Sequence, residues 1–167
     1  WSEQLFELFL TSAERNEDIN IVIDAGGLYY MKEFGCPSNA IITPHPGEAA
    51  MLLDCSVEEL QKNRLEAAKE LYKKYNCLII LKGYQTIVFD GEAYQCTDGG
   101  PALSTAGTGD VLAGLIGSFL AQGLSKIDAA RFSVAIHGAA GDKFSKNKGR
   151  RGLTATKLIS IVNEEML

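Results

Sequence analysis

The sequence predicts an α/β protein built around a mostly parallel sheet. Three short segments, residues 19–24, 40–43 and 77–82, consist largely of isoleucine, valine and leucine. Such runs are typical of strands buried on both faces, as in parallel sheets. Helix-like patterns separate them, which favours an alternation of strands and helices. Because no repeat, low-complexity segment or linker interrupts the chain, we expect one domain over residues 1–167.

Composition argues against several kinds of partner. The net charge is −5 without a basic block, so neither nucleic acid nor an anionic membrane surface is expected to bind. No apolar run approaches the roughly 20 residues that span a bilayer, and the first residues do not resemble a signal peptide. The four cysteines form no CxxC pair, and Cys77 lies in an apolar run typical of a core thiol. We therefore expect free thiols and a cytoplasmic protein, or an organellar one if a targeting segment precedes Trp1.

The first quarter of the chain predicts a helix, a strand and a turn. Leucines and phenylalanines over residues 5–10 favour an apolar-faced helix that ends before residues 16–18. The strand at 19–24 then leads into Asp24-Ala25-Gly26-Gly27-Leu28. This turn follows the carboxyl end of the strand, where open α/β sheets bind their ligands.

The second strand, residues 40–43, runs into Pro44-His45-Pro46-Gly47-Glu48. Pro46 suits the first position of a helix, because its missing N–H would have no partner there anyway. Ser56-Val57-Glu58-Glu59 is a capping-box pattern, and we expect one helix from there to about Tyr75. Its apolar positions include leucines and alanines at helical spacing.

The third strand, residues 77–82, leads into Lys82-Gly83-Tyr84-Gln85-Thr86. Asp90-Gly91 between two short β-rich segments predicts a hairpin. A loop over residues 97–101 and the stretch Ser104–Asp110 follow. Helices are then expected to about Gln122, from Ser125 to about Phe144, and after Thr154, with a basic, glycine-containing loop at residues 146–152.

The stretch Ser104-Thr105-Ala106-Gly107-Thr108-Gly109-Asp110 combines two features of a phosphate site with an acidic residue. Glycines allow a ligand to approach the backbone closely. The first turn of the following helix offers N–H groups and a partial positive charge to an anion. An acidic residue would repel phosphate, so Asp110 makes sense as a base acting on a substrate next to it. The stretch matches neither a dinucleotide-binding fingerprint nor a P-loop.

Each of these features also has a purely structural interpretation. Thr108 could cap the helix, Asp110 could be a first-turn acid favoured by the helix dipole, and His45 could be a structural histidine. Lys82 could be a solvated lysine. Three strand-end turns, at residues 24–28, 43–48 and 82–86, nevertheless fall on one rim of a parallel sheet, which favours a ligand site.

Five motifs occur in the order of a known family: Ile42-Thr43-Pro44-His45-Pro46-Gly47-Glu48, Leu81-Lys82-Gly83 with Thr86, Thr105-Ala106-Gly107-Thr108-Gly109-Asp110-Val111-Leu112-Ala113-Gly114, His137-Gly138-Ala139-Ala140-Gly141-Asp142 and Gly152-Leu153-Thr154-Ala155. Together they resemble the ADP/ATP-dependent NAD(P)H-hydrate dehydratases of the ribokinase-like superfamily. The resemblance extends from about residue 20 to the end. It implies a three-layer ribokinase-like fold with a mostly parallel central sheet, incomplete at its N-terminus.

The resemblance also implies a reaction and its residues. The terminal phosphate of ADP or ATP, with Mg²⁺, would be transferred to the ring hydroxyl of hydrated NADH or NADPH and then eliminated. Asp110 would be the general base. The nucleotide would contact Lys82, Gly83, Tyr84, Gln85, Thr86, Ala106, Gly107, Thr108 and Gly109. The hydrated cofactor would contact His45, Pro46, Gly47, Glu48 and Asp110. No dedicated protein metal site is expected.

Two segments depart from the family pattern, and alternatives follow. Gly26 stands where a second aspartate is common, and Asp98-Gly99-Gly100-Pro101-Ala102 replaces an Asn-Pro-Gly-like loop. The N-terminal half of the family domain has no counterpart here, so we expect a longer parent protein, a homo-oligomer or a second chain to complete the sheet. The alternative functions are a ribokinase-like kinase of a sugar or vitamin-precursor alcohol and a non-catalytic nucleotide-binding fragment.

Overall fold

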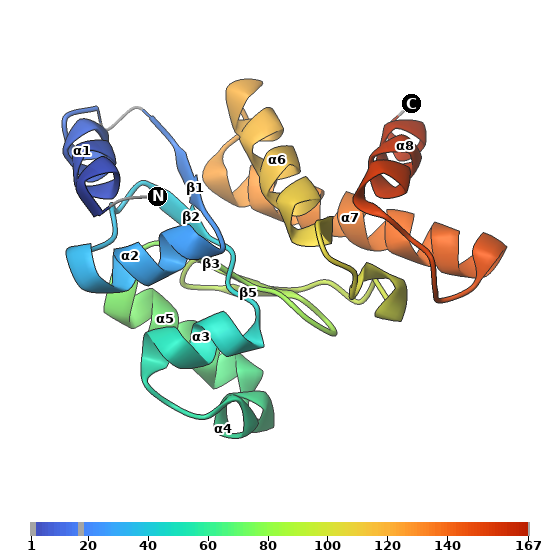
Figure 1. The fold of residues 1–167 in the computed structure, drawn as a ribbon, viewed down its shortest axis with the longest axis horizontal. Coiled ribbons are helices and arrows are strands. Elements are labelled where there is room, and N and C mark those ends of the chain that lie inside the picture. Colours follow the sequence, from blue (N-terminus) through green and yellow to red (C-terminus); the bar gives the residue numbers. More distant parts are fainter. Residues whose placement is uncertain (1–2, 17–18, 167) are drawn as a thin grey trace. The chain divides into compact units, whose positions relative to one another are not determined.

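Five strands lie side by side in chain order in the computed structural model, which describes residues 3–16 and 19–166 (Figure 1). They are β1 (Ile21–Ile23), β2 (Ala40–Ile42), β3 (Leu78–Leu81), β4 (Ile87–Phe89) and β5 (Ala93–Gln95). β1, β2 and β3 are parallel, and β4 runs antiparallel to β3. The three predicted buried strands are therefore confirmed as the parallel part of a mixed sheet.

The chain divides into two compact units, the first formed by residues 1–83 and 87–94 and the second by residues 84–86 and 95–167. The first unit contains β1 to β4 and the helices α1 (Glu3–Glu14), α2 (Gly26–Phe34), α3 (Pro46–Leu53), α4 (Val57–Lys62) and α5 (Arg64–Tyr75). The second contains the short 3₁₀ helix η1 (Pro101–Leu103) and the helices α6 (Thr108–Ala121), α7 (Lys126–Lys148) and α8 (Ala155–Glu165). The single-domain interpretation stays a prediction.

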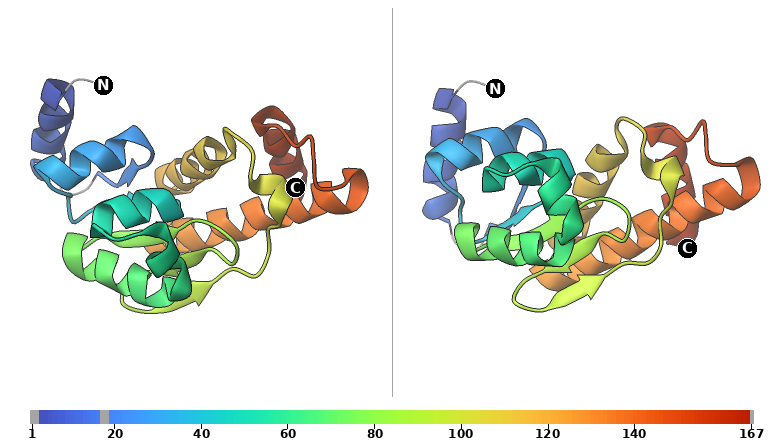
Figure 2. Two further views of the ribbon diagram at one scale, coloured as in Figure 1. Left: turned by 60° about the horizontal axis from the view of Figure 1, so that its bottom comes forward. Right: turned by 90° about the horizontal axis from the view of Figure 1, so that it is seen from below.

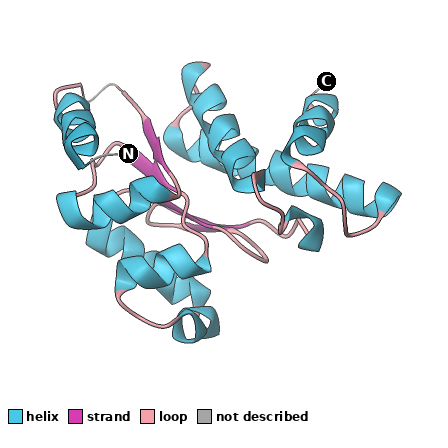
Figure 3. Ribbon diagram, viewed as in Figure 1, coloured by secondary structure: helices cyan, strands magenta, loops and turns pink. Residues whose placement is uncertain are grey.

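Alternate residues of the parallel strands form the core of the first unit. Ile23, Ile42 and Leu81 belong to one apolar cluster with side chains from α2, α3 and α5. Figure 3 shows the strands as magenta arrows next to these helices. Ile41 and Ile80 occupy the intervening positions and are also fully buried. The parallel strands read as continuous apolar runs because their residues are buried on both faces, apart from Val22 of β1, which is half-buried.

The first unit differs from expectation at two places. One helix was expected from Val57 to Tyr75, but α4 and α5 are separate because Asn63 leaves the helical region at φ −147°, ψ 76°. Its side-chain Oδ1 accepts a hydrogen bond from the N–H of Glu66, which caps α5.

α2 was not predicted, since its two opening glycines resemble a turn. The expected end of α1 is confirmed at Glu14, whereas residues 17 and 18 lie outside the described residues.

The second unit is helical. α7 is a long helix that continues to Lys148, past its expected end at Phe144, and α8 packs against it (Figure 2). Leu153, Leu158 and Phe144 belong to their shared apolar cluster. A side chain at Gly141 would come within 2.6 Å of Leu103, so this glycine allows η1 to pack closely against α7.

The cysteine predictions are confirmed. All four thiols are free, and Cys77 and Cys96 are buried whereas Cys55 is exposed. Within residues 3–16 and 19–166, no helix combines the length and the apolar character needed to cross a membrane.

Candidate functional site

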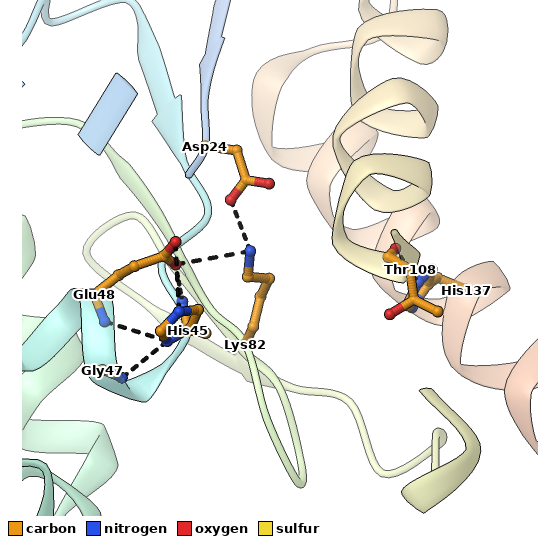
Figure 4. A network of polar contacts seen from close by, with 7 residues as sticks. All are labelled: Asp24, His45, Gly47, Glu48, Lys82, Thr108 and His137. Carbon is orange, nitrogen blue, oxygen red and sulfur yellow. Dashed lines mark hydrogen bonds and ion pairs between the residues drawn. The ribbon is translucent and has the colours of Figure 1, made fainter. Parts of the chain in front are cut away.

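Lys82 connects the carboxyl ends of the three parallel strands of the first unit. Its Nζ lies 2.7 Å from Oδ1 of Asp24, which follows β1, and 3.9 Å from Oε2 of Glu48, in the first turn of α3 after β2 (Figure 4). Fewer than one fifth of each of these three side chains is exposed. The solvated interpretation of Lys82 is therefore wrong, and its ammonium group lies between two carboxylates.

The turn after Asp24 has an unusual backbone. Ala25 adopts φ 49° and ψ −124°, a combination that L-residues rarely take. Residues held in such regions cost about 1–3 kcal/mol each and cluster at functional sites. This strained turn places Asp24 at the end of β1 and immediately precedes α2.

His45 caps α3 with its ring, which assigns it the structural role considered above. Its Nδ1 accepts hydrogen bonds from the N–H groups of Gly47 and Glu48 at 3.0 and 3.2 Å. The ring proton therefore sits on Nε2, which lies 3.5 Å from Oε1 of Glu48. Glu48 completes the capping box by accepting the N–H of His45 at 2.7 Å (Figure 4). Pro46 occupies the first helical position, as predicted.

Gly47 is required by the position of the His45 ring. A Cβ on Gly47 would lie 2.8 Å from Cε1 of His45, closer than carbon atoms normally approach. A side chain there would displace the ring and break the cap. More than half of the His45 side chain remains exposed, so the imidazole can cap the helix and still contact a ligand.

The segment Lys82–Thr86 is divided between the two units. Lys82 and Gly83 belong to the first unit, where the N–H of Lys82 donates to the carbonyl of Pro44 at 2.9 Å. Tyr84, Gln85 and Thr86 belong to the second, where the carbonyl of Thr86 accepts the N–H of Cys96 at 2.9 Å. Gly83 and Gln85 have positive φ, which makes this a tight turn.

The glycine-rich stretch of the second unit is held by a hydroxyl and an imidazole. The hydroxyl of Thr108 lies 2.6 Å from the carbonyl of Leu103 and 2.8 Å from that of Thr105. His137 on α7 donates from Nε2 to the carbonyl of Thr108 at 2.9 Å (Figure 4). The helix cap is Gly107, at φ 85°, and not Thr108 as considered from the sequence. These contacts fix the start of α6.

Several N–H groups of this stretch are available to bind an anion. Among the described residues, no hydrogen bond uses the N–H of Ala106, Gly107, Gly109 or Asp110. The N–H of Thr108 donates to Thr105 at 3.3 Å. Because the first turn of a helix also carries a partial positive charge, this group of amides is suited to bind phosphate. The side chain of Asp110 is exposed in the first turn of α6.

The motif His137–Asp142 on α7 also fixes the loop before η1. Oδ2 of Asp142 accepts the N–H of Gly99 at 3.0 Å. A Cβ on Gly138 would lie 2.8 Å from the carbonyl oxygen of Asp98, so only glycine allows the loop this close. The loop that departs from the family pattern is therefore positioned by the motif that matches it.

One part of this arrangement could be predicted, because parallel strands end at the same rim of a sheet. His45, Glu48 and Lys82 come together in the first unit, as predicted from the shared rim of the parallel strands. In the second unit Ala106 to Asp110 form one turn, in which Ala106 and Asp110 are exposed and Thr108 is buried. The pairing of Lys82 with Asp24 was missed, although an acidic residue directly after a buried strand was a usable signal. Arg64, which contacts the end of β3, was also missed. In a helix rich in lysine and arginine, the sequence does not distinguish an arginine with a structural contact from a solvated one. In the described ranges, no three His, Cys, Asp or Glu residues cluster as a metal site would require.

Comparisons with known proteins agree with these observations. A family model described as NAD(P)H-hydrate dehydratase matches residues 2–164. A bifunctional NAD(P)H-hydrate repair enzyme of Coxiella burnetii is 39% identical over 163 residues, covering 95% of this chain and 32% of that protein. An ADP-dependent (S)-NAD(P)H-hydrate dehydratase of Neisseria meningitidis is 43% identical over 117 residues, covering 69% of this chain and 39% of that protein. The chain thus spans less than two fifths of the length of these relatives.

Solved structures show the same fold. An ADP/ATP-dependent NAD(P)H-hydrate dehydratase from Bacillus subtilis, co-crystallised with ATP and Mg²⁺, superimposes with a TM-score of 0.81 at 34% identity, over 88% of this chain and 54% of that one. A ribokinase-like superfamily protein from Enterococcus faecalis gives a TM-score of 0.83 at 26% identity, over 98% of this chain and 57% of that one. The predicted α/β, ribokinase-like fold class is confirmed.

Proposed function

The chain belongs to the NAD(P)H-hydrate dehydratase family, and we propose on this premise that its protein uses ADP or ATP to dehydrate hydrated NADH or NADPH. The observation that carries the proposal is the turn at Ala106–Asp110. It presents unpartnered backbone N–H groups next to an exposed carboxylate. The N–H groups would bind a phosphoryl group, and the carboxylate would accept the proton of a hydroxyl.

The proposed reaction has two steps. The oxygen of the ring hydroxyl attacks the terminal phosphorus of the nucleotide, the bond from that phosphorus to the leaving nucleotide breaks, and Asp110 accepts the hydroxyl proton. ATP would leave as ADP, and ADP as AMP. The bond between the ring carbon and the phosphate oxygen then breaks, and phosphate leaves with the electron pair. Loss of a proton from the neighbouring ring carbon restores the dihydronicotinamide double bond. General base catalysis is typically worth about 10²–10⁴-fold in rate.

The backbone amides supply the electrostatic part. The N–H groups of Ala106, Gly107 and Gly109 would stabilise charge that develops on the transferred phosphoryl group. Losing one such donor typically costs about 10²–10³-fold in rate. Thr108, His137 and the positive φ of Gly107 hold these amides before substrate binds. Preorganised donors do not have to reorient during the reaction.

The remaining predicted contacts stay part of the proposal. Lys82 to Thr86 would contact the nucleotide, and His45 to Glu48 the hydrated cofactor. Because the ammonium of Lys82 is already paired with Asp24 and lies 3.9 Å from Glu48, we expect this segment to bind the nucleotide through its backbone and through Thr86. The exposed half of the His45 ring would meet the substrate.

Mg²⁺ would accompany the nucleotide. Within the described residues no cluster of three suitable side chains could hold the ion, and Mg²⁺ is commonly bound by substrate phosphates with only one or two protein carboxylates. The ion would neutralise charge on the phosphates during transfer. Holding and orienting the nucleotide is then left to the amides and the turn described above.

The test is an assay of the full-length protein with chemically hydrated NADH, Mg²⁺ and either ADP or ATP. We expect the dihydronicotinamide absorbance to return only when nucleotide is present, with release of one phosphate for each ring restored. The comparison of ADP with ATP, and of NADH with NADPH hydrate, identifies the preferred pair.

The assay also separates the alternative functions. Transfer of phosphate to a sugar or vitamin-precursor alcohol, with hydrated NADH untouched, would identify a small-molecule kinase. Nucleotide binding without turnover of either substrate class would identify a non-catalytic module. A ligand at about 100 times its Kd adds roughly 2.7 kcal/mol to stability, so thermal shift with ADP and AMP detects such binding.

A further inference from the structure

Arg64 contacts the end of β3 from outside the predicted site. It is the first residue of α5, and Asn63 caps the helix at this point. Its Nη2 donates to the carbonyls of Leu81 and Lys82 at 3.0 and 3.1 Å. The guanidinium is half-buried, and although this burial lowers the pKa of Arg64, the group remains charged at any physiological pH. A charged side chain thus donates hydrogen bonds to two backbone carbonyls.

The two hydrogen bonds fix the orientation of successive peptide planes. In a trans peptide the C=O and the following N–H point in opposite directions. The Leu81 carbonyl points to Arg64, and the N–H of Lys82 in the same plane points to the carbonyl of Pro44 at 2.9 Å. This peptide is therefore held from both sides. Arg64 holds the next plane through the Lys82 carbonyl, which also sets the direction of the Gly83 N–H.

Gly83 matches the position of the guanidinium. Its φ is +135°, and a Cβ there would lie 3.1 Å from Nη2, 3.4 Å from Cζ and 3.5 Å from Nη1 of Arg64. The arginine therefore occupies the volume that a side chain at residue 83 would need. Close packing and two hydrogen bonds together restrain the Lys82-Gly83 backbone.

We propose that Arg64 is a positioning residue for nucleotide binding, acting by fixing the Lys82-Gly83 backbone at the start of the predicted nucleotide-binding turn. The inference rests on the proposed function, because that function assigns the nucleotide to residues 82–86. Arg64 itself makes no contact with the nucleotide in this arrangement. Its effect passes through the direction of two peptide groups.

A purely structural arginine would behave differently in kinetics. Its loss would reduce the folded fraction and hence the apparent kcat, while the KM for each substrate stayed unchanged. A positioning residue for one ligand instead raises the KM for that ligand alone. The distinction can be measured because the enzyme takes two substrates and Arg64 supports only one of the two predicted binding segments.

The experiment compares R64M and R64K with wild type in the full-length protein, using ADP affinity by calorimetry and steady-state kinetics. R64M keeps the apolar stem and removes both charged hydrogen bonds, so we expect the Kd and the KM for ADP to rise about tenfold. We expect kcat and the KM for hydrated NADH to change by less than about twofold. R64K should fall between, because an ammonium lacks the planar fork.

K69M is the matched control. Lys69 lies on α5, pairs with Glu66 at 3.2 Å and is about half exposed, so its loss removes a cation from the same helix without touching β3. We expect wild-type ADP affinity. If R64M does not fold, the ADP affinity of R64K decides the question alone.

The outcomes separate the two proposals. A wild-type protein that binds no adenine nucleotide would overturn both. Wild-type binding that R64M and R64K retain unchanged would overturn the role of Arg64 and leave the proposed function standing. A lower kcat with an unaltered KM for ADP would also overturn it, since that result marks a structural arginine.

Discussion

The two regions that contain the predicted site residues are stabilised by different interactions. In the first unit, Asp24, Glu48 and Lys82 form a largely buried ionic network at the ends of three strands. In the second, the Ala106–Asp110 turn is held by a hydroxyl, an imidazole and a glycine in the left-handed region. The first arrangement uses charge to position side chains, and the second leaves backbone amides available for a ligand. Mutations should therefore affect stability most in the first and turnover most in the second.

The largest expected effect is the loss of turnover in D110N. Asparagine cannot accept the hydroxyl proton, so we expect kcat to fall about 10²–10⁴-fold while ADP affinity stays near wild type. Asp110 is exposed, and among the described residues its side chain makes no hydrogen bond or ion pair. Steady-state kinetics and calorimetry with ADP measure the two quantities.

D128N provides the control for D110N. Asp128 is also a first-turn acid, of α7, where it accepts the hydroxyl of Ser125 at 2.6 Å. Its loss should cost a few tenths of a kcal/mol in stability, roughly the value of a helix-dipole contact, and leave turnover unchanged. Near-normal turnover in D110N would show that Asp110 is not the base. It would also contradict the expectation that mutations in the second unit affect turnover most.

The next effect is the destabilisation caused by K82M. It leaves the carboxylates of Asp24 and Glu48 without their cation in a site where each is less than one fifth exposed. Breaking a fully buried pair costs about 3–5 kcal/mol, and the remaining water access here reduces our expectation to roughly 2–4 kcal/mol. Urea unfolding measures it. K69M, which breaks an exposed pair, should show little change.

A stability loss in K82M no greater than that in K69M would contradict the ionic description of the first unit. D24N sharpens the result. It keeps Lys82 paired with Glu48 and removes only one carboxylate charge, so its cost should be smaller than that of K82M.

G107A is expected to have a smaller effect, in the second unit. Gly107 has φ 85°, and an added Cβ would lie 3.1 Å from Cβ of Ala155. The left-handed conformation alone costs a non-glycine residue about 1–2 kcal/mol. We expect a loss of that size in the free energy of unfolding, with a fall in turnover because the amides move.

G114A is the control for G107A. Gly114 lies inside α6 with open space where its Cβ would be, so alanine should stabilise the helix by about 0.5–1 kcal/mol. Equal effects of the two substitutions would show that the conformation of Gly107 is not what holds the turn.

Most of the fold could be predicted because its signals are local. The strands are continuous apolar runs, and Ser56 and Pro46 mark helix starts by chemistry that acts within four residues. The break at Asn63 was missed because both sides of it are good helix sequence, and only the bond from its side chain to Glu66 reveals the second start. α2 was missed because glycines at a helix start resemble a turn.

The site was predicted less completely, because its contacts join residues far apart in sequence. The rim argument placed His45, Glu48 and Lys82 together, since parallel strands end on the same side. It could not show that Lys82 pairs with Asp24, 58 residues away. The cap made by His45 was equally invisible, because imidazole is an unusual capping group. Side-chain direction, rather than position along a strand, was the missing information.

The smallest effect tests whether the two regions open independently, using thiols as reporters. Cys77 lies in the core of the first unit, and Cys96 in the second, where its thiol lies 3.8 Å from the carbonyl of Val134. Burial raises the pKa of Cys96, and because the thiolate is the reactive form, its labelling should be slow at pH 8 and faster at higher pH. Exposed Cys55 should react first. Mass spectrometry after iodoacetamide treatment resolves the three sites.

We expect K82M to increase labelling of Cys77 and not of Cys96, and G107A to do the reverse, because each substitution loosens one locally cooperative region. The expected change is severalfold in labelling rate, well below the effects on turnover. Cys55, exposed in both variants, provides the internal reference for reagent and pH. If labelling of both buried thiols became faster in both variants, the two regions would unfold together. The contrast between the ionic network of the first unit and the hydroxyl and imidazole contacts of the second would then not correspond to separate local stabilities.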